Sequence, residues 1–167
     1  MEPEIAEKQS IVELARAPAT SAELQARILR FIIGGRRFGI VASAVMEVTV
    51  PPEITPISFG SDFLTGIAPL RGEIVAVIDL AAAVGEVSSA HVSKAKYIIL
   101  HPMQPGESLP IAFAIDRIEE VSTIQAVDVE AVDESESPCI VGRTKSHKPP
   151  IEIVDHRKLP RILSHSR

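Results

Sequence analysis

Apolar and polar residues alternate along this chain in short blocks that end at glycine or proline. Residues 28–33 and 36–41 are apolar-rich and are joined by Gly34-Gly35. A glycine pair supplies the positive φ angles of a tight two-residue turn, so these runs predict a β-hairpin. Residues 42–48 follow with a pattern that we interpret as two helical turns, which the prolines at 51–52 would end.

A second pair of apolar runs, residues 63–70 and 73–80, meets at Arg71-Gly72. We expect another pair of strands joined at that point. An arginine between two apolar strands must either extend out of a core or serve at a surface. Residues 80–85 then favour one helical turn closed by Gly85.

The second half of the chain predicts further short strands and one terminal helix. They are expected at residues 95–100, 110–115, 119–124, 139–144 and 150–154, with the helix at 155–163. Strands do not alternate with long helices, so we predict an all-β class of small barrels or a sandwich rather than a doubly wound sheet. Residues 1–26 do not show this pattern of short strands and are expected to be an extension, helical or partly disordered.

Composition narrows the possible partners of this 167-residue chain. Its net charge of −5 argues against a surface that is basic throughout. Residues 116–136 carry eight acids and one base, and we expect an exposed acidic connection there. Residues 143–167 carry seven bases and two acids, which keeps nucleic-acid binding by a small barrel open as an alternative function.

No pattern typical of catalysis or of a cofactor site stands out. The five histidines are scattered, and the single cysteine, Cys139, lies between Pro138 and an apolar pair, as expected for a buried, unreactive thiol. We therefore predict no enzyme activity, no metal and no cofactor. The acidic N-terminal residues lack the features of a signal peptide and no apolar run reaches bilayer length, so we expect a cytoplasmic protein.

The segment FLTGIAPLRGEIVAVIDLAAAVG, residues 63–85, resembles the signature of the CheW-like family, the coupling proteins of bacterial chemoreceptor arrays. Gly66, the Leu70-Arg71-Gly72 triplet and the Asp79-Leu80 pair fall on that pattern. The resemblance extends from about residue 30 to residue 163. Two positions depart from it: Pro69 stands where the family usually has asparagine, and Ala76 stands where proline is common.

The resemblance implies two small five-stranded SH3-like β-barrels that share a hydrophobic core. We place the first barrel at about residues 27–92, the second at about 93–155 and a C-terminal helix at about 155–163. It implies a non-catalytic adaptor that binds the regulatory domain of a CheA-type histidine kinase and the cytoplasmic tip of a chemoreceptor. Such an adaptor would be recruited to membrane receptor arrays without inserting in the membrane, and pilus motility or another receptor-kinase pathway is open as an alternative to flagellar chemotaxis.

Six residues are the candidate protein-binding site that the resemblance implies. The kinase side is expected at Val45, Glu47, Thr65 and Gly66 of the first barrel. Arg71, with Gly72 beside it in the turn, is expected to contact the receptor tip or the kinase through its guanidinium. The alternative for Arg71 is an internal ion pair that only holds the turn.

Overall fold

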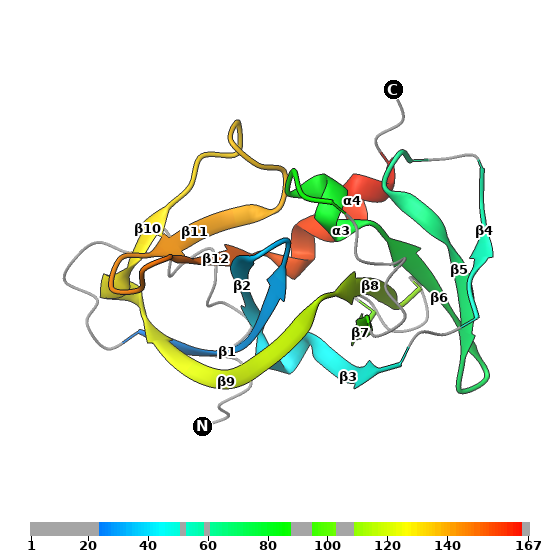
Figure 1. Ribbon diagram of the computed structural model, residues 1–167, viewed down its shortest axis with the longest axis horizontal. Coiled ribbons are helices and arrows are strands. Elements are labelled where there is room, and N and C mark those ends of the chain that lie inside the picture. Colours follow the sequence, from blue (N-terminus) through cyan, green and yellow to red (C-terminus); the bar gives the residue numbers. More distant parts are fainter. Residues whose placement is uncertain (1–23, 51–52, 59–60, 88–94, 103–108, 165–167) are drawn as a thin grey trace.

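The computed structural model describes residues 24–50, 53–58, 61–87, 95–102 and 109–164, which form two six-stranded sheets (Figure 1). In sheet A the strands follow the order β10-β11-β12-β2-β1-β9, and in sheet B the order is β3-β7-β8-β6-β5-β4. Sheet A consists of β1 (Gln25–Ile33), β2 (Arg36–Val41), β9 (Arg117–Gln125), β10 (Val129–Ala131), β11 (Ile140–Thr144) and β12 (Ile151–Val154). Sheet B consists of β3 (Val45–Thr49), β4 (Thr55–Pro56), β5 (Leu64–Leu70), β6 (Glu73–Ile78), β7 (Lys96–Leu100) and β8 (Ile111–Ile115).

The all-β class and its two-part architecture are confirmed, but the strands are divided between the sheets differently from the prediction. Each sheet has six strands. Sheet B is one continuous stretch of chain, whereas sheet A combines the first two strands with the last four. The cause is long-range pairing: β1 pairs with β9, and β2 runs parallel to β12.

Both predicted hairpins are present. In the first, Gly34 and Gly35 have φ angles of 60° and 79° and join β1 to β2. The helix expected at residues 42–48 is wrong beyond its first turn, because a 3-10 turn, η1 (Ala42–Ala44), leads directly into β3. Pairing of β3 with β7 in sheet B overrides the weak local preference of this short segment.

One large core lies between the sheets, and a smaller one lies within sheet B. Strand β7 contributes to both cores: Ile98 and Leu100 belong to the large shared core, and Tyr97 and Ile99 belong to the smaller one. Side chains alternate across a strand, so a strand buried on both faces becomes a continuous apolar run. The ring centroids of Phe31 in sheet A and Phe113 in sheet B are 5.7 Å apart.

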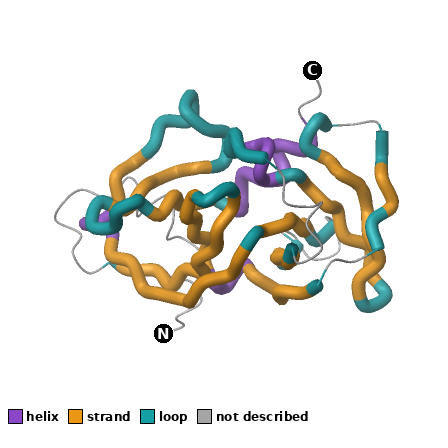
Figure 2. Tube along the Cα trace, viewed as in Figure 1, coloured by secondary structure: helices purple, strands orange, loops and turns teal. Residues whose placement is uncertain are grey.

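Helices are short, as expected, and strands dominate the described chain (Figure 2). Asp79 caps α3 (Leu80–Ala83), because its carboxylate accepts a hydrogen bond from the Ala82 backbone N–H at 3.0 Å. The predicted C-terminal helix is present as a 3-10 turn, η3 (His156–Lys158), followed by α4 (Leu159–Ser164). A further 3-10 turn, η2 (Ala126–Asp128), precedes β10.

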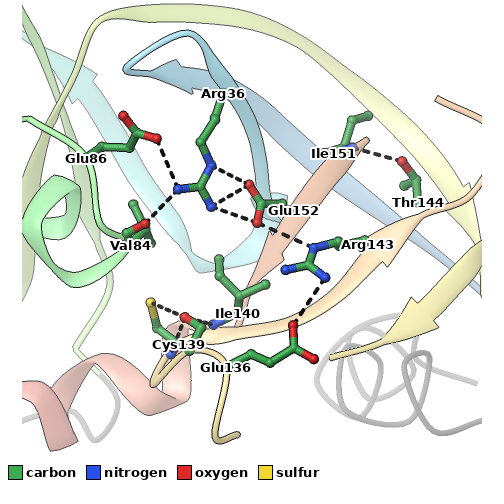
Figure 3. A network of polar contacts seen from close by, with 11 residues as sticks. Arg36, Val84, Glu86, Glu136, Cys139, Ile140, Arg143, Thr144, Ile151 and Glu152 are labelled. Atoms are coloured by element: carbon green, nitrogen blue, oxygen red, sulfur yellow. Dashed lines mark hydrogen bonds and ion pairs between the residues drawn. The ribbon is translucent and has the colours of Figure 1, made fainter. Parts of the chain in front are cut away.

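Arg36 ties sheet A to the end of α3 (Figure 3). Its Nε and Nη2 atoms donate to the two carboxylate oxygens of Glu152 on β12, both at 2.8 Å. Its Nη1 donates to the Val84 carbonyl at 2.7 Å and to the Glu86 carboxylate at 3.1 Å. Both residues come directly after α3, which follows β6 of sheet B. A forked cation that satisfies three partners at once fixes the sheets relative to each other.

The predicted N-terminal extension lies mostly outside the described residues. Gln25 and Ala26 belong to β1, so this strand begins two residues before the predicted boundary at residue 27.

Candidate partner-binding surface

The β5–β6 turn holds Arg71 in a conformation that is unusual for arginine. Arg71 and Gly72 have φ angles of 50° and 80°, and Leu70 pairs with Glu73 on either side of them. A two-residue turn with positive φ at both positions strongly favours asparagine or glycine at the first. Arginine therefore stands where the turn alone would select another residue, and such strain is a feature of functional sites.

The Arg71 side chain is 76% exposed and forms an ion pair with Glu47 across sheet B. Its Nε lies 2.9 Å from a carboxylate oxygen of Glu47, which is 20% exposed on the edge strand β3. One ion pair at Nε leaves the outer part of this largely exposed guanidinium open to solvent. Val45, two residues before Glu47, is half-buried and packs against the shared core.

Thr65 and Gly66 lie at the other end of β5. The pairing with β6 shifts between Leu64 and Gly66, so Thr65 is the extra residue of a β-bulge and is exposed. Gly66 is buried, and a Cβ atom there would collide with the carbonyl oxygen of Thr55 on β4. Glycine is needed at this position so that β4 can pair with β5.

The six predicted site residues form two groups, and Val45 and Glu47 lie with Arg71, not with Thr65 and Gly66. Arg71, Gly72 and Glu47 meet at the hairpin tip, and Val45 belongs to the same edge strand as Glu47. Gly66 lies five residues before Arg71 along β5, which is roughly 17 Å at the usual rise per residue, and Thr65 lies one residue further away. A partner at one group can leave the other group accessible.

The two departures from the family pattern each have a structural consequence. Pro69 is exposed and pairs with Ile74. Beside a two-residue turn the first pair, Leu70 with Glu73, is hydrogen-bonded, and the next pair, Pro69 with Ile74, is not. The position where Pro69 lacks an N–H therefore faces away from β6, and no β5–β6 hydrogen bond is lost. Ala76, by contrast, uses its N–H, which donates to the Pro110 carbonyl at 2.9 Å, a bond that proline could not make.

An apolar groove of about 190 Å³ lies between α4 and the face of sheet B that also carries the shared core. Ala76 and Ile111 line it from the sheet, Pro160 and Leu163 line it from α4, and Leu109, which is 51% exposed, also lines it. Sequence reasoning missed this groove, because its residues come from four separate segments. None of them carries a motif that could have revealed it.

Two apolar residues of β6, Ala76 and Ile74, lead from the groove toward the hairpin tip. Val75 and Val77 belong to the core inside sheet B, so Ala76 and Ile74 point to the opposite face. Ile74 is 51% exposed, and two residues of strand separate it from the groove wall by about 7 Å. An apolar strip therefore connects the groove to the turn that carries Arg71.

Two histidines also line the groove, His101 and His156. Burial lowers the pKa of His156, although Asp155 beside it acts in the opposite direction. The His156 Nδ1 atom is buried and has no hydrogen-bond partner within the described part of the chain. The imidazole is therefore held neutral, in keeping with an apolar wall.

The remaining candidate chemistry is structural. Burial raises the pKa of the Cys139 thiol to about 11, and the residue is fully buried, as predicted for an unreactive thiol. Among the described residues no group of three metal-ligating side chains occurs, and no helix there is long and apolar enough to span a membrane. Two basic residues of η3 form ion pairs, Arg157 with Asp155 at 3.0 Å and Lys158 with Glu134 at 2.8 Å. These ion pairs leave the two side chains less available to bind the phosphates of a nucleic acid.

Comparison with known proteins places this fold in a family of scaffolds. The CheW-like domain family matches residues 27–162, and the chain belongs to this family. Among solved structures it is similar to the scaffolding protein TtCheW from Thermoanaerobacter tengcongensis, with 25% sequence identity and a TM-score of 0.66. That match covers 78% of this chain and 88% of TtCheW. No curated protein sequence matches this chain.

Proposed function

We propose that this protein is a non-catalytic adaptor that couples chemoreceptor signalling tips to a CheA-type histidine kinase on the cytoplasmic side of a receptor array. The observation that carries the proposal is the hairpin tip, where an exposed arginine occupies a left-handed position that the turn alone would give to asparagine. A residue kept against local preference points to a contact with a partner. Membership of the CheW-like family and the likeness to a scaffolding protein support this choice of partner classes.

The receptor tip binds at the groove and the strip that leads to Arg71. A chemoreceptor tip is helical, and a helix presents an apolar stripe flanked by polar and charged residues. The groove and Ile74 offer an apolar surface of matching kind, and the Arg71 guanidinium stands at its end, where it can pair with a carboxylate. Because Glu47 pairs with Arg71, our proposal puts Glu47, and Val45 on the same strand, on this side and not on the kinase side expected from the resemblance.

The kinase regulatory domain binds at the bulge around Thr65. Thr65 is exposed there, and Gly66 lets β4 approach closely, so the buried glycine acts by shaping the surface and not by direct contact. Bulges often re-aim side chains at binding sites. An adaptor of pilus motility or of another receptor-kinase array would use the same two sites.

Pairwise binding of the two partners to single variants tests this assignment. Leu109→Asp places a charge in the groove and is expected to abolish binding of a receptor-tip fragment while a kinase regulatory-domain fragment still binds. Thr65→Arg is expected to do the reverse. Val87→Asp and Thr123→Arg, at exposed positions elsewhere, are the matched controls and should leave both affinities unchanged. The proposal fails if neither fragment binds the unaltered chain, or if each variant weakens both partners equally.

A further inference from the structure

Ser61 is a buried polar residue between the two proposed binding sites. It is 7% exposed, and its hydroxyl donates to the backbone carbonyl of Ile162 in α4. The same oxygen accepts a hydrogen bond from the Phe63 backbone N–H at 3.1 Å, and the Ser61 carbonyl accepts from the Leu64 N–H, also at 3.1 Å. One side chain thus joins the C-terminal helix to the turn that begins β5.

Each end of this connection leads directly to one proposed site. On the helix side, Leu163 follows Ile162 and lines the groove. On the strand side, Leu64 begins β5 and Thr65 is the bulged residue that follows it. Ile162 is itself buried in the shared core, and Phe63 packs against the same core. A displacement of α4 therefore has a short covalent and hydrogen-bonded route to the bulge.

We propose that Ser61 couples the two binding sites, so that a receptor helix in the groove changes the affinity of the bulge for the kinase. The proposal rests on the proposed function, which assigns those sites to receptor and kinase. A side chain that enters the groove presses on Pro160 and Leu163 and moves the Ile162 carbonyl. The Ser61 hydroxyl is hydrogen-bonded to this carbonyl and to the Phe63 N–H, so it can pass the displacement on to the start of β5.

Ser61 is therefore a positioning residue that touches neither partner. Coupling between two binding sites is reciprocal, so the kinase must raise or lower the affinity for the receptor tip by the same factor. A general loss of stability would instead lower the affinity for each partner when that partner binds alone.

The test measures four dissociation constants by calorimetry on the full chain. They are those of the receptor-tip fragment with and without saturating kinase regulatory-domain fragment, and those of the kinase fragment with and without saturating receptor tip. For the unaltered chain we expect each partner to change the affinity for the other about fivefold or more, by equal factors. For Ser61→Ala we expect single-partner affinities within about twofold of the original and a coupling factor near one.

Ser146→Ala is the control, because it also removes a hydrogen-bonded hydroxyl, which donates to Asp128 at 2.6 Å, and Ser146 lies between β11 and β12 of sheet A and belongs to neither site. It should retain full coupling. Ser61→Thr keeps the hydroxyl and should restore most of the coupling, which covers the case in which Ser61→Ala destabilises the fold. Undiminished coupling in Ser61→Ala, or independent binding of the two partners to the unaltered chain, would overturn the proposal and leave the proposed function standing. Failure of either partner to bind at all would instead refute the proposed function.

Discussion

Replacing Arg71 by asparagine separates the stability of the turn from its use in binding. A left-handed backbone costs an ordinary residue about 1–2 kcal/mol, and asparagine less. The substitution also removes the ion pair with Glu47, and an exposed pair of this kind contributes about 0.2–1 kcal/mol. The relief of backbone strain is comparable to this contribution or exceeds it. We therefore expect Arg71→Asn to leave the free energy of unfolding unchanged or to raise it by up to about 1 kcal/mol.

Binding should respond in the opposite direction. An arginine whose guanidinium is buried against a partner and paired with a carboxylate contributes about 2 kcal/mol, so the dissociation constant for the receptor tip should rise roughly 30-fold. Arg71→Lys keeps the charge and the strained backbone but lacks the planar fork, and we expect it to be nearly as damaging. Urea melts and calorimetric titrations of both variants give the two quantities. Unchanged affinity, together with a fall of more than about 1 kcal/mol in the unfolding free energy of Arg71→Asn, would show that Arg71 only holds the turn.

Three further predictions concern the interior. The Cys139 thiol, with its pKa raised to about 11, should not react with a thiol reagent at pH 8 in the native state, and rapid labelling without unfolding would contradict its burial. His156 has a pKa lowered by burial, so the unfolded chain takes up a proton first as the pH falls below about 6.5. The free energy of unfolding should therefore fall between pH 7 and pH 5.5, and His156→Gln should reduce that loss; an equal loss would assign it to other groups. Arg36→Met should cost about 3 kcal/mol in a urea melt by leaving the Glu152 carboxylate poorly paired, and Arg36→Met combined with Glu152→Met should recover much of it. A fully additive double variant would deny that the two residues act as a pair.

The sequence predicted those parts of the fold that depend on neighbouring residues. Gly34-Gly35 and Arg71-Gly72 located two turns, because positive φ angles have a clear residue signature. Five strands of the second half were located to within a few residues, and β7, β8 and β12 were clear because burial on both faces produces uninterrupted apolar stretches. The three-residue strand β10 was missed. The helical turn predicted at residues 80–85 is present as α3, and Gly85 after it has a positive φ of 79°.

Features that depend on distant pairing could not be obtained in this way. The helical prediction for residues 42–48 failed because β7, some fifty residues later, recruits this segment into sheet B. The parallel pairing of β2 with β12 mixes the two ends of the chain in one sheet, and no local pattern signals it. The groove and the Ser61–Ile162 contact arise from the same long-range arrangement, so they became visible only in three dimensions.

Simultaneous binding is the most direct measure of an adaptor. The full chain is mixed with a receptor-tip fragment and a kinase regulatory-domain fragment, and the molar mass of the eluting complex is determined by light scattering after size-exclusion chromatography. Two separate sites, at the groove and at the bulge, predict one species that contains all three proteins. Displacement of one fragment by the other, leaving only two-protein complexes, would contradict the proposed coupling of receptor to kinase by this chain.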